Sequence, residues 1–472
     1  MLQKNILFLL CLLAGLCSCK KYLQVQPQGS YSEEQVYASA GAMQQALNGL
    51  YINLADTALY GQNLTMTTIE LLGQRYQPSN SGNGILIASY FTNYLYNDAR
   101  VQAVFEGLWK KAYSTILAAN LFIARANEAT ARQVVTAGQG QQLVGEAVAI
   151  RAMMHFDLLR LFGPIYPVNA NVPAIPYYTE ADGHSQPLLT ATQVMEKVLA
   201  DFNTAATLLA ADPVITQGVV NNNNFYYGMR NQRMNYYAVK GLLARAYLWA
   251  GNKQQAHDQA LEVITQGEKW FPWTAPAVIQ TLQDNPDRIF SSEVLLSVYN
   301  PKMYTTYTGW FSEDLKEAVN TAEPTRLRET FEDIANDYRY NENTWRARQL
   351  SKKCFYKFAD VTDPLKTFRF LQPLLRKSEM YYILAETETD SQQALGYLNK
   401  VRYNRNLVNL TNASTLQLEI AKEYRKEFWG EGQLFFYYKR NNASLVPSGQ
   451  SAYYSVAPAY VVPLPLSETT PR

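Results

Sequence analysis

Residues 143–162 read LVGEAVAIRAMMHFDLLRLF and are the most strongly patterned part of the chain. Apolar residues recur there at the three- and four-residue intervals that put them on one face of an α-helix: Leu143, Ala147, Ile150, Met154, Leu158 and Leu161. Gly163 and Pro164 follow, and they end the helix because glycine favours its C-terminal cap and proline cannot continue it. The pattern predicts a helix at the centre of the core.

The same periodicity recurs along most of the chain and predicts a mainly α protein. Further amphipathic segments cover residues 32–54, 101–127, 191–211, 234–250, 254–267, 378–387, 391–402 and 415–439. No alternation of polar and apolar residues is long enough to predict a β-sandwich or a barrel.

The composition excludes several classes of protein. Hydrophobic residues make up 47% of the 472 residues, which is enough to bury a sizeable core. Charged residues account for only 17%, against roughly 25% in an average soluble protein, while the chain holds 34 tyrosines. The formal net charge of +2 provides no basic surface for a phosphate backbone, so we expect no nucleic-acid partner.

The amino terminus predicts export. Lys4 precedes an apolar run, Ile6–Leu16, which suits the hydrophobic region of a signal peptide and is too short to span a bilayer. Cleavage after residue 18 would remove two of the four cysteines, so we expect no disulfide framework. We interpret Cys354, which follows two lysines and precedes a phenylalanine, as a small buried hydrophobe.

Residues 16–19, LCSC, resemble the bacterial lipobox, in which a small residue precedes a cysteine that is acylated and becomes the new first residue. We expect residues 1–18 to be the signal peptide and Cys19 to be the lipidation site. Cys17 fits less well, because a leucine would then precede the cut. A plain secretory signal cut near Ser18 is the alternative. Lipid chains on Cys19 would tether the protein to a membrane that its body does not span.

A helical-repeat signal appears in the middle of the chain. Gly251 and Asn252 join two predicted helices by a tight turn. The residues around this turn fall at the intervals of a tetratricopeptide unit: Leu243, Ala244, Tyr247, Gly251, Ala256, Ala260 and Val263. Residues 381–401 hold a degenerate second copy, so we expect a partial helical-repeat scaffold.

Three long polar segments, residues 74–98, 218–235 and 299–324, separate these helices and are rich in Asn, Gly and Tyr. Loops of this length in a compact protein are either functional or disordered. Their aromatic rings are atypical of disorder. We therefore expect the three segments to be functional rather than disordered.

Five blocks of sequence, in order, carry a resemblance to a known family. They lie at residues 26–51 (QPQ, SEEQVY and ALNGLY), 109–120 (WKKAY), 146–163 (EA, RA and FDLLRLFG), 242–252 (LLARAYL and GN) and 394–440 (AL, LN, VR, RKEFWGEG and KR). Together they resemble the SusD/RagB family of outer-membrane lipoproteins, over nearly the whole chain after residue 18.

The resemblance implies a mainly α, SusD-like fold with a tetratricopeptide-like scaffold and long ligand-binding loops. It implies a single domain over residues 19–472, with an N-terminal part at about 19–215 and a C-terminal part at about 216–472. It also implies a lipoprotein on the outer membrane that captures oligosaccharide or polysaccharide and delivers it to a SusC-like TonB-dependent transporter. Location on the outer face rests on the family alone, because Lys20 and Lys21 stand where acidic residues often mark surface export.

SusD-like ligand loops lie just before the Trp-containing helix and in the middle of the second half, which correspond by order to residues 90–98 and 299–311. Aromatic rings there would stack on the apolar faces of sugars, and amides would bond the hydroxyl groups. We expect ligand contacts from Tyr94, Tyr96, Asn97, Tyr304, Tyr307, Trp310 and Phe311. About half of such aromatics pack loops onto helices instead. Tyr226 and Tyr227 are a third candidate pair.

The sequence argues against catalysis. Glu427 and Glu431 are four residues apart, as a glycosidase carboxylate pair on one helix face would be, but in the family this block is structural. His155 and Asp157 are two apart and face about 200° apart on a helix. No metal, nucleotide or nucleophile-elbow motif occurs, so we expect no enzyme activity, no cofactor and no metal. A peptide-binding, RagB-like protein is the alternative function, and a glycan hydrolase is a less favoured one.

Overall fold

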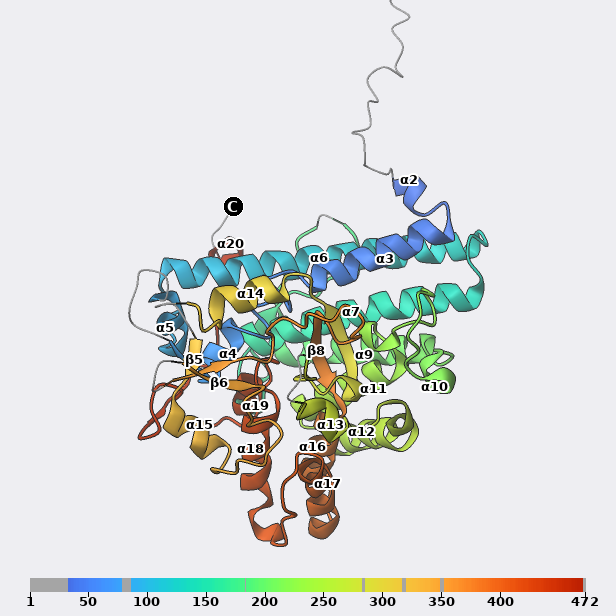
Figure 1. Ribbon diagram of the computed structural model, residues 1–472. Coiled ribbons are helices and arrows are strands. Elements are labelled where there is room, and N and C mark those ends of the chain that lie inside the picture. Colours follow the sequence, from blue (N-terminus) through green and yellow to red (C-terminus); the bar gives the residue numbers. More distant parts are fainter. Residues whose placement is uncertain are drawn as a thin grey trace, which may run out of the picture.

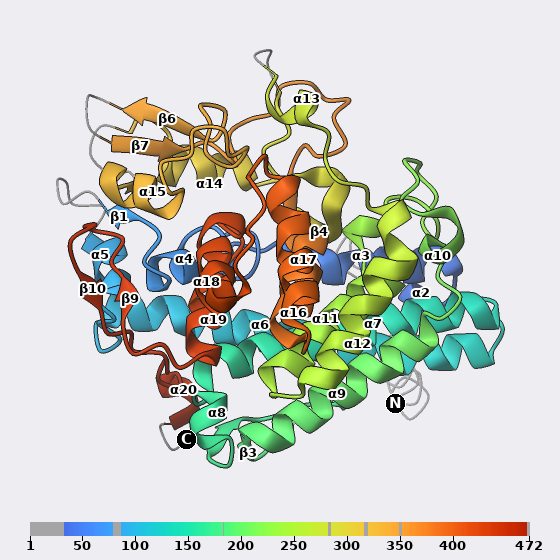
Figure 2. The same ribbon diagram turned by 90° about the horizontal axis from the view of Figure 1, so that it is seen from below.

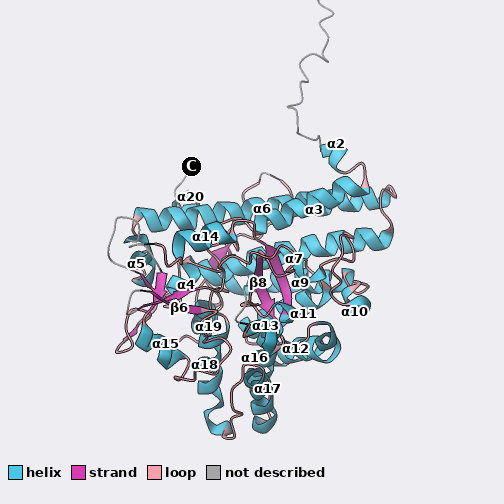
Figure 3. Cartoon of the chain, viewed as in Figure 1, coloured by secondary structure: helices cyan, strands magenta, loops and turns pink. Residues whose placement is uncertain are grey.

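The computed structural model describes residues 33–78, 86–182, 184–281, 285–315, 320–348 and 352–469. The predicted signal peptide and Cys19 lie outside these residues. The fold is mainly α, as predicted, with short strands between the helices (Figures 1 and 3). Along one side run two long helices, α6 (Ala99–Ala131) and α7 (Ala137–Phe162), and α3 (Ala40–Leu54) packs on α6.

Helix α7 is the central helix of the core, as its pattern predicts. A capping box begins it: Thr136 Oγ1 accepts a hydrogen bond from the Gln139 backbone amide (3.3 Å), and the Gln139 side chain accepts one from the Thr136 amide (3.1 Å). Every residue from Leu143 to Phe162 is buried, including the polar ones. The helix is enclosed on more than its apolar face, because α6 and α9 (Ala191–Leu208) pack on either side.

The helical-repeat scaffold is a stack in which each helix packs on the next. In order along the stack these are α7, α9, α11 (Tyr236–Trp249), α12 (Lys253–Gly267), α16 (Lys377–Thr387), α17 (Ser391–Tyr403) and α18 (Leu416–Glu427). Gly251 takes a φ of 80° in the turn between α11 and α12, where a side chain would be strained. None of the described helices is both long and apolar enough to cross a bilayer.

The prediction of one helix over residues 415–439 is wrong, because α18 ends at Glu427 and a second helix begins at Leu434. Gly430 and Gly432 have φ values of 77° and 72°, which no helix accommodates. Their backbone amides donate to the two carboxylate oxygens of Glu70, at 3.0 and 2.8 Å. The chain therefore turns around a buried carboxylate before α19 (Leu434–Arg440) begins. Helical periodicity alone does not reveal such a turn.

Short strands lie between the helices, mostly where the sequence predicts no element. An antiparallel pair, β4 (Val294–Tyr299) with β8 (Leu371–Arg376), crosses the middle of the molecule. A second sheet has the order β1 (Gln77–Pro78), β5 (Asn320–Ala322), β7 (Lys352–Phe355) and β6 (Trp345–Arg348). Segment 299–324 also holds a helix, α14 (Met303–Trp310), and is not one loop. Elements of two to eight residues are too short to show a clear period.

The remaining elements are short helices and strands that connect or cover this scaffold. They are α2 (Glu33–Val36), α4 (Thr68–Leu72), α5 (Leu86–Thr92), α8 (Tyr166–Asn169), α10 (Val214–Gln217), α13 (Pro276–Ile279), α15 (Pro324–Thr330), α20 (Leu466–Thr469), β2 (Pro173–Ile175), β3 (Leu189–Thr190), β9 (Val446–Pro447) and β10 (Ser455–Val456).

A buried ionic cluster joins α18 to the rest of the C-terminal half. The Glu427 carboxylate receives guanidinium hydrogen bonds from Arg405 (2.6 and 3.0 Å), Arg339 (2.9 Å) and Arg376. Burial alone would raise the pKa of Glu427, but the three arginines hold it well below its usual value. Glu431 is bound by Arg376 and by Lys357. Both carboxylates of the possible glycosidase pair are thus buried counter-ions.

The polar residues of the α7 motif are also fixed by buried partners. Arg151 forms a two-pronged ion pair with Asp201, with both N–O distances 2.7 Å. His155 stacks on Tyr177, with the ring centroids 3.7 Å apart. Its Nε2 accepts a hydrogen bond from the Tyr178 amide (3.1 Å), so Nδ1 carries the proton and donates to the Arg151 carbonyl (3.0 Å).

Burial lowers the pKa of His155 to about 3, so acid should destabilise the fold through this residue. The unfolded chain binds a proton at this imidazole below about pH 6.5, whereas the folded chain does not, so stability falls as the pH falls. Between pH 7 and pH 5 the expected loss is about 2 kcal/mol. Urea unfolding at pH 7 and pH 5 measures the free energy of unfolding. The decrease between the two pH values should be about 2 kcal/mol smaller in His155→Gln than in the wild type. An equal loss in both proteins would contradict the assignment.

Candidate functional site

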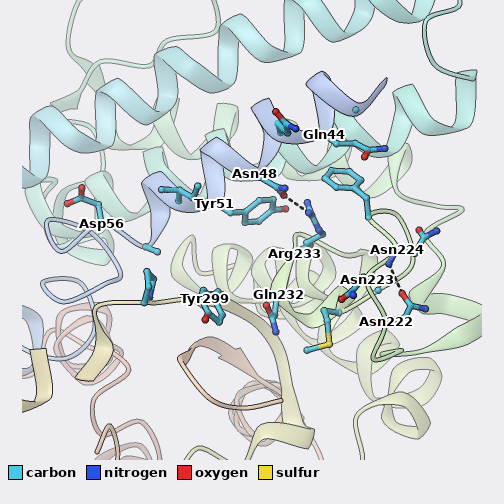
Figure 4. Close-up of a pocket in the computed structure, with 18 of the residues that line it drawn as sticks. Gln44, Asn48, Tyr51, Asp56, Asn222, Asn223, Asn224, Gln232, Arg233 and Tyr299 are labelled. Carbon is cyan, nitrogen blue, oxygen red and sulfur yellow. Dashed lines mark hydrogen bonds between the residues drawn. The ribbon is translucent and has the colours of Figure 1, made fainter. Parts of the chain in front are cut away.

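A cavity of about 890 Å³ opens between α3, the segment 222–233 and the loop that follows β4 (Figure 4). Two of the three long polar segments predicted to be functional, 218–235 and 299–324, therefore contribute to it. Its lining is dominated by uncharged amides: Gln44, Gln45, Asn48, Asn222, Asn223, Asn224 and Gln232. Three aromatic side chains, Tyr51, Phe225 and Tyr299, complete most of the wall.

Arg233 forms the floor of the cavity, beneath α3. Its guanidinium lies over the Phe225 ring, 4.0 Å from the centroid, and 5.2 Å from that of Tyr51. It donates to Asn48 Oδ1 (2.5 Å), and Figure 4 shows this bond crossing the cavity floor. The side chain of Arg233 is 13% exposed. The floor is thus a fixed cation whose charge is largely shielded from solvent.

A second layer beneath the floor connects the cavity to the core helix α7. Glu146 on α7 accepts hydrogen bonds from the Tyr51 hydroxyl (2.6 Å) and from Arg230 (2.6 Å), and lies 3.4 Å from Arg233. Burial alone would raise the pKa of Glu146, but Arg230 and Arg233 hold it below its usual value. The carboxylate therefore stays ionised and orients the floor residues.

The Asn-rich segment is held in tight turns by its own side chains. Asn222 Oδ1 accepts from the Asn224 amide (3.0 Å), and Asn224 Oδ1 accepts from the Tyr226 amide (2.9 Å). Asn222, Asn223 and Asn224 are exposed, whereas Tyr226 is buried. The cavity is thus lined by the asparagines and Phe225, and not by the tyrosine pair that the sequence singled out.

Tyr299 lines the opposite wall and begins a row of three aromatic rings that continues away from the cavity. Tyr299 is 52% exposed at the end of β4, and its ring lies 5.4 Å from that of Phe370. Phe370 in turn lies 4.5 Å from Tyr304, at the start of α14. Asn300 fixes the turn between them: its amide donates to the Phe370 carbonyl (2.7 Å) and its side chain to Gly61 O (2.9 Å). The row presents ring faces on a rigid support.

The structure places the first predicted ligand loop away from this cavity. The Tyr94 hydroxyl donates to Leu72 O (2.9 Å), and the Tyr96 hydroxyl donates to Ala459 O (2.7 Å). Tyr96 is 9% exposed and packs on Phe105, whereas Asn97 is exposed. The two rings are thus held against neighbouring segments, whereas the Asn97 side chain faces solvent.

The second predicted loop is mostly helix α14. Phe311 is fully buried against Tyr76, and Tyr307 is 7% exposed. Tyr304 and Trp310 are half-buried. None of the seven predicted residues lines the cavity, although Tyr299, in the same predicted loop, does. Tyr304 reaches the cavity wall indirectly, through Phe370.

Sequence reasoning missed the contribution of α3. The helix carries no charged residue, so its polar face consists of the amides of Gln44, Gln45 and Asn48 together with Asn53. An amphipathic helix with an uncharged polar face is unusual, and this was the signal available in the sequence. Asn48 and Tyr51 also belong to the block 46–51 that supported the family resemblance.

Two family profiles match consecutive parts of the chain. The first, SusD-like and described as "Starch-binding associating with outer membrane", matches residues 21–248. The second, the SusD family, matches residues 295–460. A SusD-like protein of Bacteroides ovatus is 23% identical over 477 residues, which cover 88% of this chain and 78% of the relative. One of Formosa agariphila is 22% identical over 62% of this chain, which spans only about half, 51%, of that relative.

Solved structures show the same fold. A SusD superfamily protein from Bacteroides thetaiotaomicron superposes with a TM-score of 0.70 at 22% identity, covering 91% of this chain and 97% of that one. A laminarin-binding SusD-like protein superposes with a TM-score of 0.64 at 18% identity, covering 92% and 98%. The matched profiles, the relatives and the shared fold agree with the five sequence blocks, and the chain belongs to the SusD/RagB family.

Proposed function

We propose that this protein is a glycan-binding lipoprotein of the outer membrane, anchored through Cys19 after removal of residues 1–18. It captures oligosaccharide or polysaccharide on the outer face and delivers it to a SusC-like TonB-dependent transporter. Family membership and the laminarin-binding protein of the same fold support the ligand class. Residues 19–472 act as one domain, with its two parts meeting near residue 215.

The observation that carries the proposal is the chemistry of the cavity. Seven amide side chains provide paired donors and acceptors, the pattern that sugar hydroxyl groups require. Tyr299 adds an exposed ring face on which the apolar side of a sugar can stack. Three charged residues, Asp56, Arg233 and Lys302, also line the cavity. Asp56 lies 3.5 Å from Lys111 and Arg233 lies 3.4 Å from Glu146, so two of these three charges have a counter-ion. The lining therefore favours a neutral, polyhydroxylated ligand.

The seven residues predicted from the family remain part of the proposal, with different roles. Asn97, Tyr304 and Trp310 retain exposed or half-exposed surface, and we propose them as additional ligand contacts. Tyr304 belongs to the row of aromatic rings that begins at Tyr299 and passes through Phe370. The other four residues pack in the interior or donate hydrogen bonds to backbone carbonyls, and we propose that they shape the loops: Tyr94, Tyr96, Tyr307 and Phe311.

Affinity electrophoresis tests the function. Residues 20–472 are run through native gels that contain laminarin, starch, xylan or mannan, and reducing ends are assayed in parallel. We expect one of these polysaccharides to retard the protein without any new reducing ends. Release of reducing ends would favour the hydrolase alternative, and no retardation by any of them would favour peptide capture.

Trp310→Ala tests the contribution of α14. We expect a loss of affinity for the retarding polysaccharide of at least tenfold, about 1.4 kcal/mol, because a half-exposed indole face is removed. The melting temperature, measured on the same samples, separates a binding defect from a folding defect. Tyr403→Ala, which removes a 71% exposed ring at the end of α17, is the matched control. Unchanged affinity would remove Trp310 from the site.

A further inference from the structure

A second aromatic surface lies on the β9–β10 hairpin. Residues 441–467 contain no Asp, Glu, Lys, Arg or His, although charged residues make up 17% of the chain. The hairpin within this stretch presents two adjacent rings: Tyr453 is 90% exposed and Tyr454 is 48% exposed. Two adjacent exposed rings offer a larger apolar face than a single exposed ring such as Tyr403, and a face of this kind is suited to stacking on a ligand.

The hairpin holds these rings on a rigid backbone. Arg326 of α15 donates to three of its carbonyl oxygens, those of Ser448 (2.8 Å), Ser451 (2.7 Å) and Tyr454 (3.1 Å). One buried guanidinium thus fixes both ends of the hairpin loop. A pre-organised surface loses little entropy when a ligand binds, which is a property of binding sites and not of flexible tips.

A second set of hydrogen bonds fixes the hairpin from the other side. Gln77 Nε2 donates to Gln450 O (3.0 Å), and Gln450 Nε2 donates to Thr92 Oγ1 (3.0 Å). The Gly449 amide donates to Gln74 Oε1 (3.4 Å). These partners belong to segment 74–98, the first of the three long polar segments. The hairpin is therefore bound directly to the described residues of that segment, at Gln74, Gln77 and Thr92.

This surface is separate from the cavity. None of the residues that line the cavity belongs to the hairpin. Figure 2 shows β9 and β10 beside α5, on the other side of the molecule from α10, whose chain leads into the cavity segment 222–233. A ligand that touches both regions must be an extended chain. A single sugar or a short oligosaccharide could occupy only one of them.

We propose that Tyr453 and Tyr454 form a second contact for a neutral polysaccharide whose other part occupies the cavity. This inference rests on the proposed function. The rings supply stacking faces, and the Ser, Asn and Gln residues of segment 441–467 supply hydroxyl and amide groups for the sugar hydroxyls. That segment carries no charge of its own, and the neighbouring Arg326 is paired with Glu329. Two contacts on one chain add avidity, because the second binding step is intramolecular.

The double variant Tyr453→Ala/Tyr454→Ala tests the inference by calorimetry. The probes are the laminarin, starch, xylan or mannan that retards the wild type, and a trisaccharide prepared from it. We expect affinity for the polysaccharide to fall at least fivefold and affinity for the trisaccharide to change less than twofold. Tyr453→Phe should retain affinity because it keeps the ring, and Tyr403→Ala should behave as the wild type.

The outcomes distinguish failure of the hairpin contact from failure of the proposed glycan-binding function. Equal polysaccharide affinity in the wild type and the double variant overturns the hairpin contact while the cavity stands. An equal loss for both probes also overturns it, because the hairpin would then not act as a separate contact. If the wild type binds none of the polysaccharides, the proposed function itself fails, and the hairpin contact fails with it.

Discussion

Replacing Glu427 with Gln is expected to lower the free energy of unfolding by about 3–5 kcal/mol. Arg405, Arg376 and Arg339 all donate to this carboxylate, and the side chains of Arg405 and Arg376 are fully buried. Without the negative charge, these cations remain in the protein interior with too few counter-charges. Removing one partner of a buried ionic cluster costs far more than the cluster contributes in net stability.

Urea unfolding at pH 7 measures this effect. Glu342→Gln is the control, because Glu342 is exposed and a surface substitution is expected to change stability by less than about 0.5 kcal/mol. A loss below about 1 kcal/mol in Glu427→Gln would show that the cluster is hydrated or rearranged. It would also reopen the question of whether Glu427 and Glu431 serve a chemical role.

Tyr299→Ala is expected to weaken glycan binding at least thirtyfold, about 2 kcal/mol. Tyr299 offers the most exposed ring in the cavity wall, and Phe370 supports it from behind. Aromatic anchors of this kind dominate binding energy, because they bury a large area with few rotamers to restrict. Isothermal titration with the retarding polysaccharide and its trisaccharide measures the loss, which should appear with both probes.

A matched control comes from the neighbouring segment. Tyr227 is 43% exposed but does not line the cavity, so Tyr227→Ala should leave affinity unchanged. Equal losses in the two variants would point to a non-specific effect of removing surface tyrosines. Unchanged affinity in Tyr299→Ala would place the binding site elsewhere.

The helical scaffold could be predicted from the sequence because local pattern determines it. The helix over 143–162 lies where its apolar spacing put it, and it starts earlier only because Thr136 and Gln139 form a capping box. The prediction failed at residues 428–433, where Gly430 and Gly432 turn around Glu70. That turn depends on a carboxylate some 360 residues away in sequence, which periodicity does not reveal.

The candidate site was harder to predict for a related reason. The aromatic residues indicated which segments of the sequence could bind ligand, but they did not show whether each ring points into the cavity or into the core. Phe311 points into the core while Tyr299, in the same predicted loop, lines the cavity. The cavity also requires α3, which lies more than 160 residues from Asn222 in sequence. In the sequence, the amide side chains of α3 look like those of any solvent-facing helix. Only the fold brings them next to segment 222–233.

A crystal structure with the trisaccharide of the retarding polysaccharide tests the central claim most directly. We predict sugar density in the cavity between α3 and segment 222–233, with one ring stacked on Tyr299 and hydroxyl groups within hydrogen-bond distance of Asn48 or Gln232. Sugar bound over α14 or at another surface, with the cavity left empty, would contradict the account.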